Sequence, residues 1–181
     1  MQEIILKRIY SATDNDIKIL APMVDEAFAL TMMDAPDKVK DFPLPTGNDL
    51  IVGLKNGMEL WKIYQGDTLV GGALISIKDT VTGYLELFFI AGNAEGKGIG
   101  TKAWKAIENA YPNVKIWETA TPYFQKRNIH FYVNKCGFHI VSYYNKWNPY
   151  IENGKPVDDE MFVFRKENDK LEFIDLGGFN Y

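Results

Sequence analysis

The sequence predicts a single domain of the mixed α/β class, a twisted mixed sheet with helices on both of its faces. Three observations support this class. Strand and helix patterns alternate along the chain, a glycine-rich loop joins an apolar strand to a helix near its middle, and 46% of its 181 residues are hydrophobic. A chain of this length and apolar content buries one full core, and alternating elements of both kinds form a sheet covered by helices.

The first half of the chain begins with a strand and two helical segments. Apolar residues predict a strand over 4–10, and Thr13-x-x-Asp16 resembles a capping box that opens a helix with one apolar face. Pro22 lies inside that helical pattern, so we expect a kink or a division of the helix there. Prolines and charges predict a loop over 33–48. The remaining elements of this half are a helix over 49–54 and a hairpin of strands 60–64 and 68–77.

The second half alternates strands and helices around the glycine-rich loop. An apolar strand over 84–90 precedes the loop, and Ile99 begins a helix that Tyr111-Pro112 ends. The elements that follow are a strand over 114–117 ending at Glu118, a helix closed by Gly137, and strands over 139–147 and 160–166. Segment 148–159, between the last two strands, is rich in turn residues.

Glycines recur at positions 96, 98 and 100, immediately before a helix. Glycine accepts positive φ angles and adds no Cβ, so successive backbone N–H groups converge on one anion, and the helix start adds its own N–H groups and dipole. Lys97, Lys102 and Lys105 make this segment basic within a chain of formal net charge -4. The pattern predicts a phosphate-binding loop. The alternative is an ordinary strand-to-helix turn with solvated lysines.

Two well-known phosphate loops differ from this spacing. A Walker A loop has four residues between its first glycine and Gly-Lys, then Ser or Thr; here the intervening residues number three, and Gly98 follows Lys97. The dinucleotide fingerprint needs two residues before its last glycine, whereas one residue separates Gly98 from Gly100. A dinucleotide-binding oxidoreductase stays a minor alternative, because the following strand ends at Glu118, where a ribose-binding acid would lie.

Two segments resemble motifs of the GCN5-related N-acetyltransferases, the GNAT family. Segment 95–100, Glu-Gly-Lys-Gly-Ile-Gly, resembles motif A, which reads Arg or Gln, two residues, Gly, one residue, then Gly or Ala; it fits at both glycines and departs at its first residue. Segment 128–138 resembles motif B, with Phe131-Tyr132 followed by Gly137-Phe138. Four residues separate the tyrosine from the glycine, where the commonest form has three. The resemblance implies a GNAT domain over 1–167 with a mostly antiparallel sheet.

The resemblance also implies an acetyltransferase whose co-substrate is acetyl-CoA. The family holds the pyrophosphate of CoA on this loop and the pantetheine arm between two splayed central strands, here 84–90 and 114–118. The implied cofactor-binding residues are Gly96, Lys97, Gly98, Ile99, Gly100 and Thr101 in the loop, the backbone groups of Phe89 and Ile90, and the side chain of Asn128. A backbone N–H on the first strand would stabilise the oxyanion of the tetrahedral intermediate.

Acetyl transfer to an amine needs a base for the ammonium proton and an acid for the leaving thiolate. Tyr132 is the candidate acid, because a phenol of pKa about 10 is protonated at neutral pH; its alternative is an aromatic ring packed beside Phe131. Glu86 and Glu118 are the candidate bases, because each interrupts an apolar strand, where a carboxylate is costly unless paired or used. Each is equally well explained as a solvent-facing or ion-paired glutamate.

The acceptor pocket is expected between segments 28–52 and 143–159, the regions that form it in the family. Both contain acidic and aromatic side chains, a combination that favours a cationic amine. These are Asp34, Asp37, Asp41, Phe42, Tyr143, Tyr144, Trp147, Tyr150, Glu152, Asp158 and Asp159. We expect a small-molecule amine, such as a polyamine, aminoglycoside or amino-acid-like compound, ahead of a peptide N-terminus, acetylated directly in a ternary complex. A non-catalytic acyl-CoA-binding module of the same fold is the alternative.

Composition argues against several other classes. A pI near 5.2 without a further basic stripe disfavours nucleic acid as a partner. Two histidines and one cysteine without ligand spacing disfavour a metal site. The single Cys136 can form no internal disulfide, which favours a reducing, cytoplasmic location. No signal peptide is evident, and no apolar run approaches the roughly 20 residues that span a bilayer, so no membrane association is expected.

Residues 168–181 extend past the expected domain and are apolar. Their large apolar residues are Leu171, Phe173, Ile174, Leu176, Phe179 and Tyr181. A segment of this kind is too apolar for a solvated tail. We expect it either to dock on its own domain or to contribute to a homodimer interface.

Overall fold

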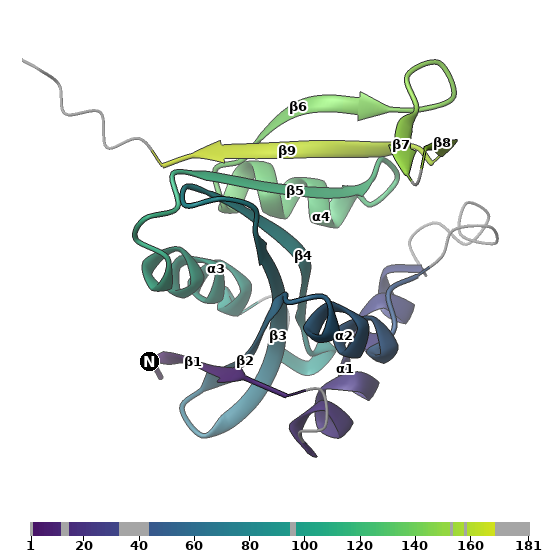
Figure 1. Ribbon diagram of the computed structural model, residues 1–181. Coiled ribbons are helices and arrows are strands. Elements are labelled where there is room, and N and C mark those ends of the chain that lie inside the picture. The colour runs from purple at the N-terminus through teal and green to yellow at the C-terminus, as the bar shows by residue number, and fades with distance from the viewer. Residues whose placement is uncertain are drawn as a thin grey trace, which may run out of the picture.

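The computed structural model describes residues 2–11, 15–32, 44–94, 97–152, 154–157 and 159–168, and it confirms the mixed α/β class. Figure 1 shows the arrangement of its elements. In chain order they are β1 (Ile4–Ile9), α1 (Asn15–Met32), α2 (Gly47–Lys55), β2 (Glu59–Gln65), β3 (Thr68–Ile77), β4 (Thr82–Ile90), η1 (Gly92–Ala94), α3 (Ile99–Ala110), β5 (Ile116–Pro122), α4 (Lys126–His130), η2 (Phe131–Lys135), β6 (His139–Tyr144), β7 (Tyr150–Glu152), β8 (Lys155–Val157) and β9 (Met161–Glu167). The expected order of strands and helices is confirmed, with the β7–β8 hairpin added before the last strand.

Seven strands form one sheet in the order β1-β2-β3-β4-β5-β9-β6, and β7 pairs with β8 in a separate hairpin. Neighbouring strands of the sheet are antiparallel, except β4 and β5, which are parallel. The expected mostly antiparallel sheet is therefore confirmed. A dinucleotide-binding fold needs a mostly parallel, doubly wound sheet, so that alternative is wrong.

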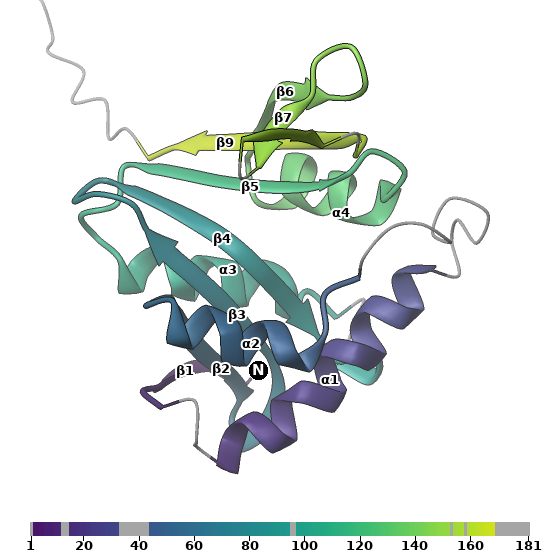
Figure 2. The same cartoon turned by 45° about the vertical axis from the view of Figure 1, so that its right-hand side comes forward.

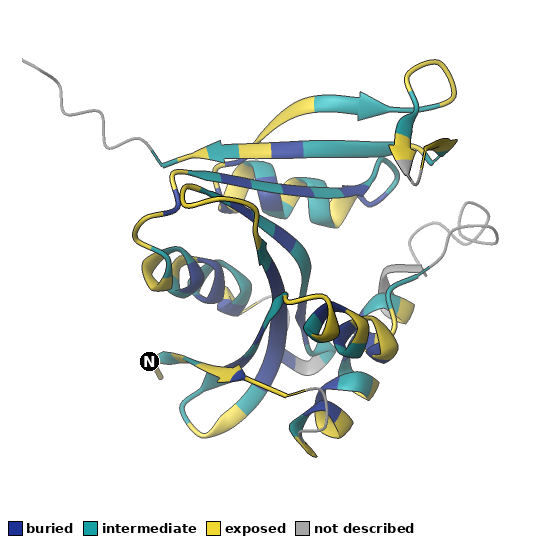
Figure 3. Cartoon of the chain, in the orientation of Figure 1, coloured by how far each residue is buried: buried dark blue, intermediate teal, exposed yellow. Residues whose placement is uncertain are grey.

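Helices cover both faces of the sheet (Figures 1 and 2). On one face, α1 and α2 pack through a cluster that includes Leu20, Leu50 and Phe89 of β4. On the other, α3 and the α4–η2 helix pack around Trp104 and Trp117, whose ring centroids lie 5.2 Å apart. Buried residues accordingly run along the central strands and the inner sides of the helices (Figure 3). β4 contributes to both clusters, so it is held from both faces.

A kink or a division was expected at Pro22; α1 is one continuous helix, so the division is wrong. Pro22 lacks the N–H that would bond to the carbonyl of Lys18. Both residues are exposed, so water can satisfy that carbonyl, while buried Leu20 and Val24 hold the two halves of the helix on the sheet. The capping box expected at Thr13 lies outside the described residues. Of the described helices, none has the length and hydropathy needed to cross a membrane.

β5 and the segment before β9 differ from expectation. β5 begins two residues after Val114 and continues past Glu118 to Pro122. β9 pairs with it along this whole length, and because that partner is distant in sequence, local apolar periodicity did not reveal the extension. The segment expected to contain turns carries the β7–β8 hairpin, which turns at Gly154 with a φ of 76°. Of the expected extension 168–181, only Asn168 is described.

Gly71 of β3 lies so close to β4 that a Cβ there would be 2.1 Å from the carbonyl oxygen of Phe89. We therefore expect Gly71→Ala to force the two strands apart and lower the free energy of unfolding by about 1–3 kcal/mol, as overpacked cores do. Val81→Ala, an exposed truncation between the same strands, is the control and should be nearly neutral. Denaturant unfolding measures both, and an unchanged midpoint for Gly71→Ala would contradict this description.

Candidate active site

β4 and β5 run side by side over three residue pairs and then part, as Figure 2 shows for the course of the two strands. The parallel pairs are Thr82 with Ile116, Gly83 with Trp117 and Tyr84 with Glu118. Beyond them β4 continues beside β3, while β5 continues beside β9. We call the point of parting, at Tyr84 and Glu118, the fork. From Leu85 to Ile90, the edge of β4 that faces β5 has no strand partner among the described residues, and such backbone groups can bind an extended ligand.

A β-bulge and a threonine hold the fork open. Two consecutive residues of β3 face Leu85 and Leu87, so Glu86 is an extra residue on β4. Leu85 packs on the α3 side of the sheet and Leu87 on the α1 side, although strand residues two apart normally share a face. On β5, Thr119 Oγ1 donates a hydrogen bond to the Leu85 carbonyl oxygen over 2.9 Å. This bond satisfies the first carbonyl beyond the ladder, so the strands part without leaving it unpaired.

A cavity of about 630 Å³ opens between β4, the start of α3 and the α4–η2 helix. Its size is within the range of ligand sites, about 300–1,000 Å³. Seven residues expected to bind the cofactor line it, namely Phe89, Ile90, Gly98, Ile99, Gly100, Thr101 and Asn128. Of the other two expected residues, Gly96 lies outside the described residues, and Lys97 is exposed and is not part of the lining.

The lining also includes residues that were not expected to bind the cofactor. They are Ala27, Phe28, Phe88, Lys102, Arg127, Phe131 and Lys135. Phe88 and Phe131 stack with ring centroids 5.6 Å apart and planes 10° apart, which joins β4 to the helix across the cavity. Arg127, Phe131 and Lys135 recur at every fourth residue, a spacing that could have identified this helix face from the sequence. Three cations line the cavity, namely Lys102, Arg127 and Lys135, and they favour an anionic ligand.

The start of α3 has the geometry of an anion site. Gly98, its N-cap, has a φ of 72°, in the left-handed region that favours glycine. No acidic residue lies in the first turn. At Gly100 a Cβ would lie 3.1 Å from the Phe131 ring, so the missing side chain keeps the cavity open beside the helix start. The unpaired N–H groups and dipole of such a helix start bind phosphate.

The α4 helix continues as a π-helix, η2, in which a backbone N–H donates over 3.0 Å to the Phe131 carbonyl five residues earlier. The wider turn absorbs one extra residue, which accounts for the four residues between Tyr132 and Gly137. Gly137 still closes the helix, with a φ of 78°. At the other end, Asn128 Nδ2 donates over 3.2 Å to Thr121 Oγ1 of β5, so Asn128 links this helix to the strand that leaves the fork.

Tyr132 packs in the core and is not part of the cavity lining. Its residue is 7% exposed, and its ring lies against Phe138 and Phe164 with centroids 5.7 and 5.4 Å away. Burial raises the pKa of Tyr132 to about 12, and a side-chain hydrogen bond with Thr119 opposes the rise. Because Thr119 also bonds to Leu85, the Tyr132 hydroxyl lies near the fork, as a phenol that stays protonated at neutral pH.

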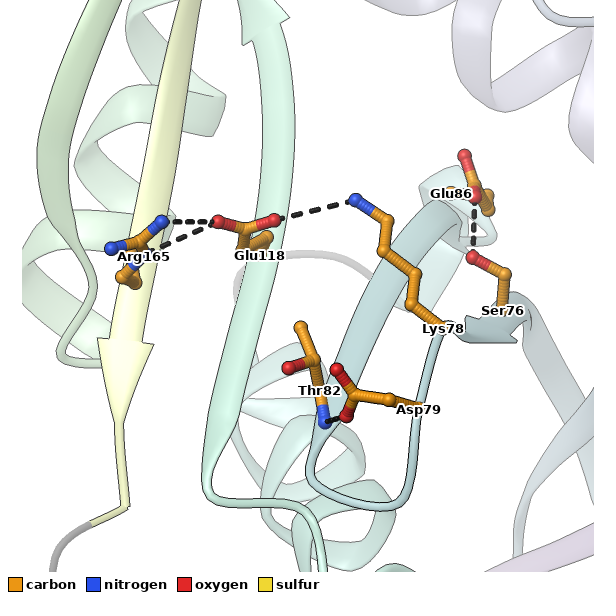
Figure 4. Close-up of polar contacts among 7 residues, drawn as sticks. All are labelled: Ser76, Lys78, Asp79, Thr82, Glu86, Glu118 and Arg165. Carbon is orange, nitrogen blue, oxygen red and sulfur yellow. Dashed lines mark hydrogen bonds and ion pairs between the residues drawn. The ribbon is translucent and has the colours of Figure 1, made fainter.

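Glu118 is an ion-paired carboxylate (Figure 4). Arg165 donates to its Oε1 from Nη2 over 2.8 Å and from Nε over 3.1 Å, and Lys78 Nζ lies 3.4 Å from its Oε2. Burial raises the pKa of Glu118, but the two cations outweigh burial and hold the pKa below its usual value. A carboxylate with a lowered pKa is a weak base, so Glu118 is the less suitable of the two candidates.

Glu86 has different surroundings. Ser76 Oγ donates to its Oε1 over 2.6 Å, and in the described part of the chain Glu86 makes no ion pair. Burial raises the pKa of Tyr84, and Glu86 and Glu118 add to the rise, so both carboxylates lie near this phenol at the fork. An extended arm running back along β4 from Ile90 would reach Glu86 after about 13 Å, at about 3.3 Å per residue. Glu86 therefore lies where the far end of a ligand anchored at α3 would come.

The segments expected to bind the acceptor are described in part. Asp34, Asp37, Asp41, Phe42 and Asp158 lie outside the described residues. Tyr144 packs against Tyr150 of β7 with ring centroids 5.7 Å apart, and the Tyr143 hydroxyl donates to Glu160 over 2.8 Å. Trp147 is 80% exposed. Of the expected aromatic residues that the structure describes, Tyr143, Tyr144 and Tyr150 thus lie at the ends of β6 and β7.

Gly100→Leu should fill the cavity beside the start of α3, since even a Cβ there would lie 3.1 Å from Phe131. We expect the dissociation constant of CoA to rise at least tenfold, with the melting temperature changed by only a few degrees, because leucine is a better helix former than glycine. Calorimetric titration and thermal unfolding measure the two quantities. An unchanged CoA affinity would place the ligand elsewhere.

The lowered pKa of Glu118 predicts a pH dependence of stability. Its contribution is present above the ordinary carboxyl pKa of 4.5 and is lost as the pH falls through the lowered value. Between about pH 5 and pH 3, the free energy of unfolding should fall less steeply for Glu118→Gln than for the wild type. Glu26→Gln, on the exposed side of α1, should follow the wild type. Parallel slopes for wild type and Glu118→Gln would refute the assignment.

Comparisons with known proteins agree with this geometry. The model of the acetyltransferase (GNAT) family matches residues 26–138. The uncharacterised protein YrkN of Bacillus subtilis (strain 168) is 41% identical over 166 residues, which cover 86% of this chain and 90% of the relative.

Solved structures share the fold at low sequence identity. A GNAT family acetyltransferase from Elizabethkingia anophelis, with acetyl-CoA bound, has a TM-score of 0.60 and 18% identity, covering 92% of this chain and 99% of that chain. The ribosomal-protein-S18-alanine N-acetyltransferase of Escherichia coli has a TM-score of 0.65 and 8% identity, covering 91% and 93%. From the family match, this chain belongs to the GNAT family: it is an acetyltransferase, and its co-substrate is acetyl-CoA.

Proposed function

We propose that this protein transfers the acetyl group of acetyl-CoA to a primary amine of a small molecule, directly within a ternary complex. The observation that carries the proposal is the fork. Along one unpaired edge of β4 it connects the phosphate-binding start of α3 with Glu86, a carboxylate held by a hydrogen bond from Ser76. A donor anchored at α3 and a base at the far end of its arm are the two requirements of the reaction.

The donor would bind along the cavity. The N–H groups at the start of α3 bind the pyrophosphate, and the ammonium and guanidinium groups of Lys102, Arg127 and Lys135 balance its charge. The pantetheine arm takes the place of a strand beside Phe89 and Ile90, whose backbone groups bond to its amides. Lys97 and Gly96 would contribute from the loop itself, and Asn128 from the facing helix.

Glu86 is the base in this proposal. It accepts the proton of the acceptor ammonium, and the freed lone pair attacks the thioester carbon. The oxygen of the tetrahedral intermediate gains stabilisation from a backbone N–H of β4 just beyond the bulge. Ser76 fixes the carboxylate for this step, whereas Glu118, held by Arg165 and Lys78, supplies a constant negative charge at the fork.

Tyr132 is the acid. When the intermediate collapses, the carbon–sulfur bond breaks and the thiolate takes the hydroxyl proton of Tyr132, whose phenolate then takes the remaining extra proton from the acceptor nitrogen. Burial raises the pKa of Tyr132 to about 12, so the phenol is protonated at neutral pH but is a weaker acid than an ordinary phenol. Proton transfer of this kind contributes about 10²–10⁴ in rate.

Direct transfer is favoured over an acetyl-cysteine intermediate. Cys136 is 4% exposed, and burial raises the pKa of its thiol to about 12. The thiolate is the nucleophilic form of cysteine, so this thiol cannot attack a thioester at neutral pH.

The experiment that tests the function measures release of free CoA thiol from acetyl-CoA in the presence of a library of small primary amines and of peptides with free N-termini. We expect release with a subset of the small amines. Binding of acetyl-CoA without release in any mixture would instead favour the non-catalytic acyl-CoA-binding module, an alternative consistent with the burial of Tyr132.

Variants of the acid and base test the roles. Glu86→Gln and Tyr132→Phe should each lower kcat by about 10²-fold or more with CoA affinity unchanged, because each removes one proton transfer. Glu118→Gln, the matched carboxylate change across the fork, should keep kcat within about tenfold of the wild type. Steady-state kinetics and CoA titration separate the two effects, and equal losses for both glutamates would remove Glu86 as the base.

A further inference from the structure

We propose that Lys78 is itself an acceptor of the acetyl group: its side-chain amine occupies the place of the acceptor amine at the fork and is acetylated by the same molecule. The inference rests on the proposed function, because the acetyl group must reach the fork. It assigns a modification site to this chain and gives the ion pair between Lys78 and Glu118 a functional role.

The backbone around Lys78 is fixed by the turn that joins β3 to β4. The Lys78 N–H donates to the Thr82 carbonyl over 3.0 Å. Asp79 Oδ1 accepts the backbone N–H groups of Val81 and Thr82 over 2.7 and 2.6 Å. The side chain of Lys78 therefore starts from a well-defined turn immediately before β4, and it points toward β5 (Figure 4).

Its ammonium lies where an acceptor ammonium is expected. Lys78 Nζ is 3.4 Å from Glu118 Oε2 and 4.7 Å from the ring centroid of Tyr84. Glu118 and Tyr84 form the last pair of the β4–β5 ladder, so both contacts are at the fork. A carboxylate and an aromatic face are the groups that bind a cationic amine in proteins. Lys78 thus uses the features of the fork that would attract an external amine.

The Lys78 side chain can also move within the fork. It is 54% exposed, and its contact with Glu118 is a long one. Exposed ion pairs of this kind are weak, because solvent screens them and long side chains lose entropy in forming them. Glu118 does not depend on Lys78, since Arg165 makes two shorter bonds to it. The Lys78 amine therefore lies beside Glu118 but can move away from it.

The proposed base lies near the start of the Lys78 side chain. Figure 4 shows Lys78 between Glu118 and the Ser76–Glu86 pair. Ser76 lies in β3, and Lys78 follows the end of that strand. Glu86, the proposed base, is bonded to Ser76, so Lys78 is two residues along the chain from the residue that holds the base.

The reaction follows the same steps as transfer to an external amine. The Lys78 ammonium gives a proton to Glu86, and the lone pair of Nζ attacks the thioester carbon of acetyl-CoA. A nitrogen–carbon bond forms, the carbon–sulfur bond breaks, and the thiolate takes the proton of Tyr132. The nitrogen then gives its second proton to the Tyr132 phenolate, and Glu86 releases its proton to solvent. The products are Nε-acetyl-Lys78 and CoA, and the fork loses one positive charge.

The test is incubation of the full chain with acetyl-CoA, followed by intact-mass and peptide mass spectrometry. We expect one added acetyl group, on Lys78. Lys78→Arg should lose it, whereas Lys55→Arg, a matched change at an exposed lysine of α2, should keep it. Glu86→Gln should slow the modification at least tenfold. Acetyl groups spread over many lysines, Lys55 included, at rates that Glu86→Gln does not change, would overturn the proposal.

Dilution and a parallel assay complete the test. At saturating acetyl-CoA, the rate constant of an intramolecular reaction does not change on tenfold dilution of the protein, and a rate constant that falls with dilution would overturn modification within one molecule. The same preparation is assayed with the amine library. CoA release with added amines but no acetyl group on Lys78 would overturn this inference and leave the proposed function intact, whereas the absence of both would refute the function itself.

Discussion

The site depends on one feature of the backbone, the early parting of two parallel strands at the centre of an otherwise antiparallel sheet. Parallel neighbours need a crossover connection, and α3 supplies it between β4 and β5. The crossover puts the start of α3 at the end of β4, and the parting leaves the edge of β4 open from there back to the fork. A candidate phosphate site and an unpaired strand edge thus follow from one connection, without separate loops to build either.

An open strand edge inside a sheet is stable only if other contacts replace the missing pairs. Here Thr119 satisfies the first unpaired carbonyl, and the bulge at Glu86 turns β4 so that Leu85 and Leu87 anchor it in different clusters. Helices pack on both faces of β4 and hold the strand in place. From Leu85 to Ile90, one edge of the strand has no strand partner among the described residues. The same bulge brings Glu86 against Ser76, so the device that opens the edge also positions the candidate base.

Local signals predicted the phosphate loop and the order of elements, because glycine spacing and apolar periodicity are properties of short segments. They could not separate Glu86 from Glu118, since each interrupts an apolar strand. The difference lies in Arg165 and Lys78, which are 47 and 40 residues from Glu118 and reach it only in the folded sheet. For Tyr132, local signals left open an acid or a ring packed beside Phe131, because the π-turn that absorbs the extra residue depends on the packing of its helix.

The two glutamates at the fork illustrate how environment assigns different roles to one residue type. Glu118 lies between two cations, which stabilise its charged form and thereby weaken it as a base. Glu86 receives one hydrogen bond from the neutral Ser76 hydroxyl, which orients the carboxylate. If Lys78 loses its charge by acetylation, Glu118 keeps Arg165 and stays ionised, so the carboxylate that attracts a cation survives the removal of its internal one. The negative charge of Glu118 would then remain at the fork for an external amine. The Lys78 ammonium would no longer compete for it.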